Sequence, residues 1–327
     1  MSEPATITAS DILSGNRAAL ARAITLSESS KREHRMTAEA LISSVMSRTG
    51  NSIRVAISGP PGVGKSSFIE AFGLYLLARG RKVAVLAIDP SSPITGGSIL
   101  GDKTRMEELA KSDRCFIRPS PSSGSLGGVA RHTREAALLC EAAGFDVVLI
   151  ETVGIGQSEV AAASMTDFFV QLHQPLSGDE LQGIKKGVME LADLVVVTKC
   201  DGASETAAGL AKSDLERALS LTRQHQERPV RVLCVSAHLN TGISGVWDEI
   251  QELWEHRQAK GQIETKRRLQ RQEWFQQELE TELMDFLTSH PRFPRAKASV
   301  GADIDKAEIH TGKAARDLIS NLLRYQD

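Results

Sequence analysis

The sequence lacks the features that define several protein classes. Lys and Arg total 39 against 41 Asp and Glu, for a net charge of −2, so there is no basic excess to hold a nucleic-acid backbone. No apolar run reaches the roughly 18 residues that span a bilayer, and the opening MSEPATITAS lacks the basic-then-apolar order of a signal peptide. We therefore expect a cytoplasmic protein that binds neither nucleic acid nor membrane.

Cysteine and aromatic residues are also scarce. The four cysteines, at positions 115, 140, 200 and 234, are far apart and form no CxxC pair, so we expect thiols in a reducing compartment instead of a disulfide framework or a zinc site. The aromatic residues are 9 Phe, 3 Trp and 2 Tyr, which leaves the core to aliphatic side chains. A length of 327 residues allows one large domain with attachments or two domains.

Short apolar runs alternate with helical segments through the middle of the chain. Runs this apolar are typical of strands buried on both faces of a sheet. The alternation predicts an α/β fold with a doubly wound, mostly parallel sheet, whose ligands bind beyond the carboxyl ends of the strands. The predicted strands occupy residues 53–58, 82–89, 145–152, 167–173, 193–199 and 230–236.

Helical patterns flank this sheet region on both sides. Apolar residues three and four apart predict helices within 8–48 and 244–289, and a Pro-containing break at 289–297 precedes a short final helix within 305–323. We therefore divide the chain into an N-terminal helical arm (1–50), a central sheet domain (51–245) and a C-terminal helical arm (246–327).

A phosphate-binding motif follows the first predicted strand. The segment GPPGVGKS is a full match to GxxxxGK(S/T), and it has the required strand before it and helix after it. Its glycines let backbone N–H groups point at phosphate oxygens, its Lys adds charge at the β and γ phosphates, and its Ser offers a hydroxyl to Mg²⁺. The sequence predicts a nucleoside triphosphatase site with nucleotide contacts from Gly59, Pro61, Gly62, Val63, Gly64, Lys65, Ser66 and Ser67.

Acidic residues lie where such a site needs them. Asp89 ends the second predicted strand and Glu151 ends the third, so both should lie at the ligand-binding edge of the sheet and order Mg²⁺ and its waters. Asp102 is a further candidate, although its spacing alone favours a solvated loop carboxylate. Gly154 could offer its N–H to a γ-phosphate and let the following loop move on hydrolysis.

Two later strand ends suggest which base is bound. GTPases commonly read guanine with Asn-Lys-x-Asp, in which the Asp accepts from the guanine N–H donors and the Lys covers the ring. Here Lys199 and Asp201 are present, but Thr198 replaces Asn and removes an amide that would brace the loop. The next strand ends in Ser236 and Ala237, which resemble the loop whose backbone contacts the guanine oxygen. Together these matches favour GTP over ATP.

Longer blocks of sequence resemble one family. The runs SGPPGVGKSSFIE, AIDPSSPITGGSILGDKTRM and GDELQGIKKGVMELADLVVVTK resemble the MeaB/ArgK/MMAA family, which are SIMIBI-class P-loop GTPases and chaperones of adenosylcobalamin-dependent acyl-CoA mutases. The resemblance extends over residues 10–255 and is densest from 55 to 200. It implies that the central domain hydrolyses GTP to GDP and phosphate, and that the C-terminal arm forms a homodimer.

The resemblance also implies roles for individual residues. An additional switch at 177–187 would sense the nucleotide through Gln182 and Lys185 when the mutase docks. The implied metal ligands for Mg²⁺ are Ser66, Asp89, Asp102 and Glu151, and the implied catalytic residues are Lys65, Asp89, Glu151 and Lys185. The implied partner is a mutase such as methylmalonyl-CoA mutase, whose cobalamin loading, protection or reactivation the GTPase would gate.

Other functions use the same phosphate loop. A metal-insertion GTPase of the hydrogenase or urease accessory type would carry a His-rich or Cys-based metal site, whereas the 8 His here are scattered. A small-molecule kinase would need a lid over an acceptor pocket, and a transport ATPase subunit would need a membrane partner. No catalytic base is evident, which favours a slow GTPase that its partner completes.

Overall fold

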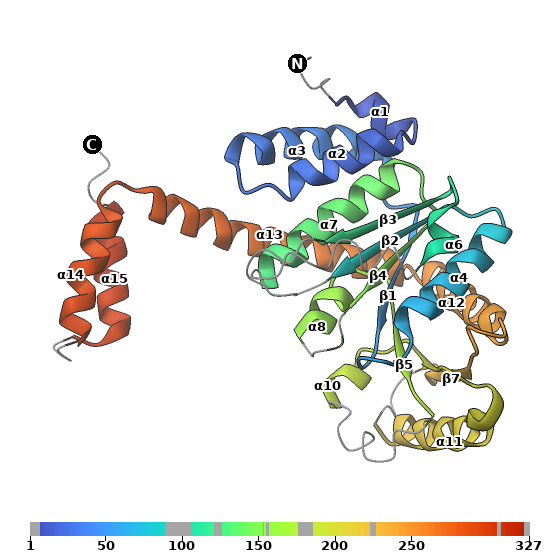
Figure 1. Cartoon of the computed structure of the whole chain (residues 1–327). Coiled ribbons are helices and arrows are strands. Elements are labelled where there is room, and N and C mark those ends of the chain that lie inside the picture. Colours follow the sequence, from blue (N-terminus) through green and yellow to red (C-terminus); the bar gives the residue numbers. More distant parts are fainter. Residues whose placement is uncertain are drawn as a thin grey trace. The chain divides into compact units, whose positions relative to one another are not determined.

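The structure is a computed structural model that describes residues 7–88, 106–120, 126–152, 154, 157–175, 186–222, 227–305 and 309–323. Its centre is a seven-stranded sheet in which every pair of neighbours is parallel, in the order β3-β2-β4-β1-β5-β6-β7 (Figure 1). This arrangement confirms the predicted doubly wound α/β fold. The strands are β1 Ile53–Ser58, β2 Val83–Ile88, β3 Cys115–Ser120, β4 Val147–Glu151, β5 Phe168–His173, β6 Leu194–Val197 and β7 Arg231–Cys234.

Strand β3 is absent from the six strands predicted by sequence. Its residues, CFIRPS, interrupt their apolar character with Arg118 and Pro119, so no continuous apolar run marks them. The strand lies at the edge of the sheet and pairs only with β2, where Pro119 is opposite Ala87. Proline is tolerated at an edge because its missing N–H costs no hydrogen bond to a further strand.

Helices cover both faces of the sheet, as Figure 1 shows. One face carries α4 (Lys65–Ala78), α6 (Glu107–Ala110) and α12 (Ile243–Ala259), and the other carries α7 (Leu126–Ala142) and α8 (Gln157–Ala163). The core is mainly aliphatic, and Phe68 and Phe72 of α4 stack on each other within it. Among the described residues, the helices between β5 and α12 are α10 (Lys186–Met189), η2 (Gly202–Ser204) and α11 (Glu205–Thr222), and α11 packs on β7.

The predicted N-terminal helical extension is present. It consists of α1 (Ala9–Leu13), α2 (Arg17–Ser27), α3 (Arg32–Val45) and η1 (Met46–Arg48), and α1, α2 and α3 all contact α7. Asn16 caps α2 because its side chain accepts from the backbone N–H groups of Ala18 and Ala19. Residues 1–267 form one compact unit together with the sheet.

Residues 268–327 form a second compact unit, which is helical as predicted. It contains most of α13 (Gln262–Ser289), followed by α14 (Phe293–Asp305) and α15 (Thr311–Leu323), which pack against each other. Helix α14 is a correction, because the stretch containing Pro294 was interpreted as a break. Pro294 lies in the first turn of α14, where its missing N–H would have no intrahelical acceptor.

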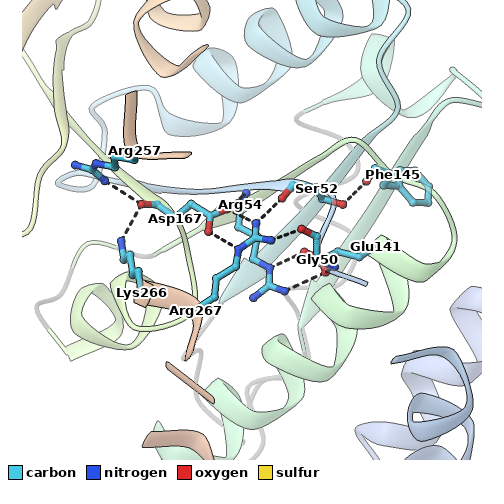
Figure 2. Close-up of polar contacts among 9 residues, drawn as sticks. All are labelled: Gly50, Ser52, Arg54, Glu141, Phe145, Asp167, Arg257, Lys266 and Arg267. Atoms are coloured by element: carbon cyan, nitrogen blue, oxygen red, sulfur yellow. Dashed lines mark hydrogen bonds and ion pairs between the residues drawn. The ribbon is translucent and has the colours of Figure 1, made fainter. Parts of the chain in front are cut away.

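A buried ion-pair cluster joins the start of α13 to the amino ends of the strands (Figure 2). Arg267 donates to both carboxylate oxygens of Asp167 at 2.8 and 2.7 Å and to the backbone oxygen of Ser52 at 2.6 Å. Arg54, at the start of β1, donates to both oxygens of Glu141 on α7 at 2.6 and 3.0 Å. The backbone N–H of Arg54 also donates to Asp167, at 2.8 Å. The cluster therefore holds the amino end of β1, which is the end opposite the phosphate loop.

The order of the strands determines where a ligand binds. Strands β2, β3 and β4 lie on one side of β1, whereas β5, β6 and β7 lie on the other, so the connections reverse direction at the carboxyl end of β1. Parallel α/β sheets bind ligands in the crevice at such a point. Among the described residues, no helix is long and apolar enough to cross a membrane.

Candidate nucleotide site

The phosphate loop leaves the carboxyl end of β1 and enters α4. Gly62 and Gly64 have φ of +80° and +95°, a backbone region that glycine adopts without strain. A Cβ on Gly59 would lie 2.8 Å from the backbone oxygen of Leu172, so that position also excludes a larger residue. Val63 is buried and anchors the loop, whereas Pro61 and Ser67 are exposed at its surface. The predicted loop residues thus come together at the N-terminus of α4.

Lys65 is the first residue of α4, and its Nζ lies over the loop. It donates to the backbone oxygens of Gly59 at 2.7 Å and Pro60 at 3.1 Å. Burial lowers the pKa of Lys65, while the negative charges of Glu151 and Glu159 act against that shift. Phosphate oxygens would be stronger acceptors for this ammonium than the two carbonyls, since they carry charge.

Ser66 and Glu151 face each other across the base of the loop. The Ser66 hydroxyl donates to Glu151 Oε1 at 3.2 Å, and Glu151 is buried at the end of β4. A hydroxyl and a carboxylate are the hard oxygen ligands that Mg²⁺ accepts, and Mg²⁺ takes its remaining ligands from phosphates and water. The pair therefore fits a magnesium site. Asp89 and Asp102, the other two predicted ligands, lie outside the described residues, as do Gln182 and Lys185.

A second buried carboxylate lies near the same lysine. Glu159 on α8 accepts from the hydroxyl of Ser58, the last residue of β1, at 3.4 Å and from the hydroxyl of Ser158 at 3.3 Å. Glu159 and Ser58 are both almost fully buried. The motif analysis did not place Ser58 in the site, although its position at the end of the first strand was a usable signal.

Gly154 lies directly on the phosphate loop. Its φ is +89°, and a Cβ at this position would be 2.1 Å from the backbone oxygen of Gly59. Real Cβ atoms essentially never approach another atom closer than 3.0 Å. The chain after β4 can therefore contact the phosphate loop only with glycine here, which brings the predicted switch residue next to the predicted phosphate site.

The predicted base-binding residues are held against the phosphate loop. The Thr198 hydroxyl donates to the backbone oxygens of Val63 at 2.7 Å and His173 at 3.1 Å. Lys199, with φ of +57°, donates from its Nζ to the backbone oxygen of Gly62 at 2.7 Å. Sequence reasoning treated Thr198 as the loss of a brace, whereas its hydroxyl connects the end of β6 to the phosphate loop.

Asp201 lies beside the loop that follows β7. The Ser236 hydroxyl donates to Asp201 Oδ2 and accepts from the backbone N–H of Leu239 at 3.1 Å. A backbone pair between Ser236 and Thr241 closes this loop, and Ala237 packs against the core. The structure thus brings together Thr198, Lys199, Asp201, Ser236 and Ala237, which come from two neighbouring strand ends.

Known proteins resemble this chain over most of its length. A family model described as "Methylmalonyl Co-A mutase-associated GTPase MeaB" matches residues 20–292. A probable GTPase of Mycobacterium tuberculosis is 48% identical over 316 residues, covering 95% of this chain and 93% of its own. GTPase ArgK of Escherichia coli is 48% identical over 282 residues, covering 86% of this chain and 85% of its own.

Two further relatives extend the comparison. A mitochondrial methylmalonic aciduria type A homolog of Mus musculus is 43% identical over 316 residues, covering 93% of this chain and 76% of its own. A crystal structure described as a LAO/AO transport system kinase has a TM-score of 0.76 and 36% identity, and the match covers 99% of both chains. The fold and the family thus extend over nearly the whole sequence.

Proposed function

Because this chain belongs to the family of methylmalonyl-CoA mutase-associated GTPases named MeaB and is therefore a GTPase, we propose that it acts as a nucleotide-dependent chaperone of a mutase. The proposed partner is an adenosylcobalamin-dependent acyl-CoA mutase such as methylmalonyl-CoA mutase. GTP hydrolysis would gate cobalamin loading, protection or reactivation of that enzyme. The same family membership argues against a metal-insertion GTPase and against a small-molecule kinase.

The observation that carries the proposal is the close approach of Gly154 to Gly59. A switch must sense the γ-phosphate through chain that lies against the phosphate loop, and the segment after β4 does so at Gly154, where an added Cβ would overlap the Gly59 carbonyl. Binding of phosphate would draw the Lys65 ammonium away from the carbonyls of Gly59 and Pro60. The carbonyl that Lys65 releases is the one against which Gly154 packs, so the two movements are coupled.

In this proposal Ser66 and Glu151 hold Mg²⁺ together with the nucleotide, and Asp89 and Asp102 complete the acidic set. When bound, Mg²⁺ neutralises charge that develops on the phosphates. Lys65 orients the β and γ phosphates, and Gln182 and Lys185 contribute when the mutase docks. Asp201 reads the base through its carboxylate, which Ser236 orients.

The proposal includes a homodimer formed by the C-terminal helices. Helix α13 exposes several large apolar side chains, between 40% and 68% exposed, which a protein normally covers. These side chains are Leu269, Phe275, Leu279, Leu283, Met284 and Phe286. Sedimentation of the whole chain at several concentrations tests the dimer, and a monomer at every concentration would contradict it.

Substitution of Lys65 tests the catalytic part of the proposal. We expect Lys65→Ala to lower GTP turnover by about 100-fold or more, because the phosphates lose their positioning charge. The control is Lys82→Ala, since Lys82 is exposed at the opposite edge of the sheet. Turnover in Lys65→Ala equal to that of Lys82→Ala would contradict the assignment of the phosphate loop.

A pull-down from the source cells tests the partner. The whole chain, loaded with a non-hydrolysable GTP analogue, should retain a cobalamin-dependent mutase, and the same chain without nucleotide should retain less. The control is Lys65→Ala under the same conditions. Repeated recovery of a metalloenzyme in place of a mutase would reject the proposed partner while leaving the GTPase activity intact.

A further inference from the structure

Helix α8 buries a glutamate and exposes a valine. Glu159 is 2% exposed, whereas the next residue, Val160, is 59% exposed. Burial of a carboxylate is costly, and glutamate is almost never fully buried unless other groups hold its charge. A turn of the helix by one residue would bury the valine instead. The observed orientation therefore has a reason other than apolar burial, as is common at functional sites.

The contacts of Glu159 lead to the strand that carries the phosphate loop. The Ser58 hydroxyl donates to Glu159 Oε1 at 3.4 Å, and the Ser158 hydroxyl donates to Glu159 Oε2 at 3.3 Å. Ser58 is the last residue of β1 and directly precedes Gly59, whose carbonyl accepts from Lys65. Glu159 is therefore joined to the phosphate loop through one hydroxyl and one peptide bond.

The segment after β4 is thus held at two points. Gly154 lies against the Gly59 carbonyl, and further along the chain Glu159 reaches Ser58. Ser58 is itself well fixed, because β1 pairs with β4 on one side and with β5 on the other, and the buried ion-pair cluster holds its amino end. The hydrogen bond from Ser58 therefore ties α8 to a fixed point of the sheet.

The sheet around the end of β1 offers further polar groups. Ser58 lies opposite Gln171 of β5, so the two side chains share the face of the sheet on which α8 packs. Gln171 Oε1 and Thr152 Oγ1, just beyond β4, are buried and have no hydrogen-bond partner among the described residues. Buried polar atoms of this kind are rare, and each calls for an explanation. The end of β1 is thus surrounded by hydrogen-bonding groups where a core is normally apolar.

We propose that Glu159 is a positioning residue for GTP hydrolysis. Through Ser58 it holds α8 on the end of β1, so that the segment after β4 keeps its place over the phosphate loop during turnover. In this role it acts through another residue and contacts neither the nucleotide nor the metal. The inference rests on the proposed function, in which that segment senses the γ-phosphate.

This role concerns turnover more than binding. The groups assigned to ground-state binding lie on other elements, with Lys65 on α4 and with Lys199 and Asp201 after β6. The hydrogen bond between Ser58 and Glu159 is long, and catalytic contacts are often long without substrate and tighten in the complex. Loss of Glu159 should therefore destabilise the transition state more than the complex with GDP.

The test compares steady-state GTP hydrolysis by the whole chain and its variants, with the folded fraction of each measured by urea unfolding. We expect Glu159→Ala to lower kcat and kcat/KM equally, by about tenfold, because an interaction made in the transition state is lost. Affinity for a fluorescent GDP analogue should change by less than about twofold, since ground-state binding is kept. Glu159→Gln should retain more activity than Glu159→Ala, because its amide oxygen can still accept from Ser58.

Ser58→Ala removes the same hydrogen bond from the other side with a small change of volume. Its turnover should also fall, and the double variant with Glu159→Ala should be no slower than Glu159→Ala alone, because the effects of two contacting residues are not additive. The matched control is Glu249→Ala, which removes another glutamate that is 2% exposed and that pairs with Arg228 and with Arg231 at the amino end of β7. It should lower the free energy of unfolding and leave turnover per folded molecule unchanged.

The other outcomes contradict the inference in different ways. Normal turnover in Glu159→Ala and Ser58→Ala, with Lys65→Ala inactive, refutes the inference and leaves the proposed function intact. Losses that multiply in the double variant would show that Ser58 and Glu159 act separately, and a loss in Glu159→Gln equal to that in Glu159→Ala would show that the hydrogen bond is not the cause. Full turnover in Lys65→Ala would overturn the proposed site, and the inference with it.

Discussion

Replacement of Gly154 by alanine is a direct test of the contact between the switch segment and the phosphate loop. The new Cβ would lie 2.1 Å from the backbone oxygen of Gly59, whereas real Cβ atoms keep at least 3.0 Å. Both contacting groups belong to the backbone, so no flexible side chain can yield. One of the two segments must move by about 1 Å, a misplacement that can cost about 100-fold in rate at an active site.

Two effects of Gly154→Ala have to be separated. At φ +89° an alanine is strained by about 1–2 kcal/mol whatever surrounds it, which lowers the free energy of unfolding. The clash with Gly59 adds a displacement of the phosphate loop, which we expect to lower kcat/KM for GTP about 100-fold, or ~2.7 kcal/mol of transition-state stabilisation. Steady-state GTP hydrolysis and urea unfolding of the same preparation measure the two effects.

Gly144→Ala is the matched control for strain without a clash. Gly144 has φ of +84°, and a Cβ there would meet nothing within 4 Å. It lies in the turn before β4, away from the phosphate loop. We expect Gly144→Ala to lose about 1–2 kcal/mol of stability and to keep its GTP turnover. The reasoning is refuted if Gly154→Ala and Gly144→Ala have the same turnover per folded molecule.

Two further substitutions probe how the site is held in place. Arg267→Met leaves the buried Asp167 carboxylate without its guanidinium, so we expect a loss of about 3–5 kcal/mol in urea unfolding, against less than about 1 kcal/mol for the exposed Arg217→Met. Equal losses would show that the buried cluster does not hold β1. Thr198→Val deprives the Val63 carbonyl of its donor, which should cost about 1–3 kcal/mol of stability and weaken GDP binding in a fluorescence titration. Unchanged GDP affinity would show that the hydrogen bond from Thr198 to Val63 does not contribute to nucleotide binding.

The fold was predictable where the physical constraint is local in the sequence. Continuous apolar runs identify strands that are buried on both faces, and the glycines of the phosphate loop identify positions with positive φ, such as Gly62 and Gly64. Strand β3 and helix α14 were not predicted from the sequence, for a common reason. Pro119 interrupts the apolar run of β3 and the stretch containing Pro294 was interpreted as a break, whereas an edge strand and the first turn of a helix both tolerate proline.

The site was predictable as a set of residue types, but its internal contacts were not. The approach of Gly154 to Gly59 depends on how two loops far apart in the chain meet at one sheet edge, and only the pairing of β1 with β4 determines that. The hydrogen bond from the Thr198 hydroxyl to the Val63 carbonyl has the same origin, because the end of β6 and the phosphate loop meet at that edge of the sheet. Spacing along the chain carries no information about either contact.

Thr198, which stands where guanine-binding motifs usually have asparagine, has a structural role of its own. Its hydroxyl reaches the backbone oxygen of Val63, and the next residue, Lys199, reaches that of Gly62. Two consecutive residues of the base loop thus hold two consecutive carbonyls of the phosphate loop. We infer that any movement of the phosphate loop on loss of the γ-phosphate is passed to the base loop, so affinity for the base depends on the state of the phosphates. In the proposed function, discrimination of guanine would then fall to Asp201 and to Ser236, whose hydroxyl donates to the Asp201 carboxylate.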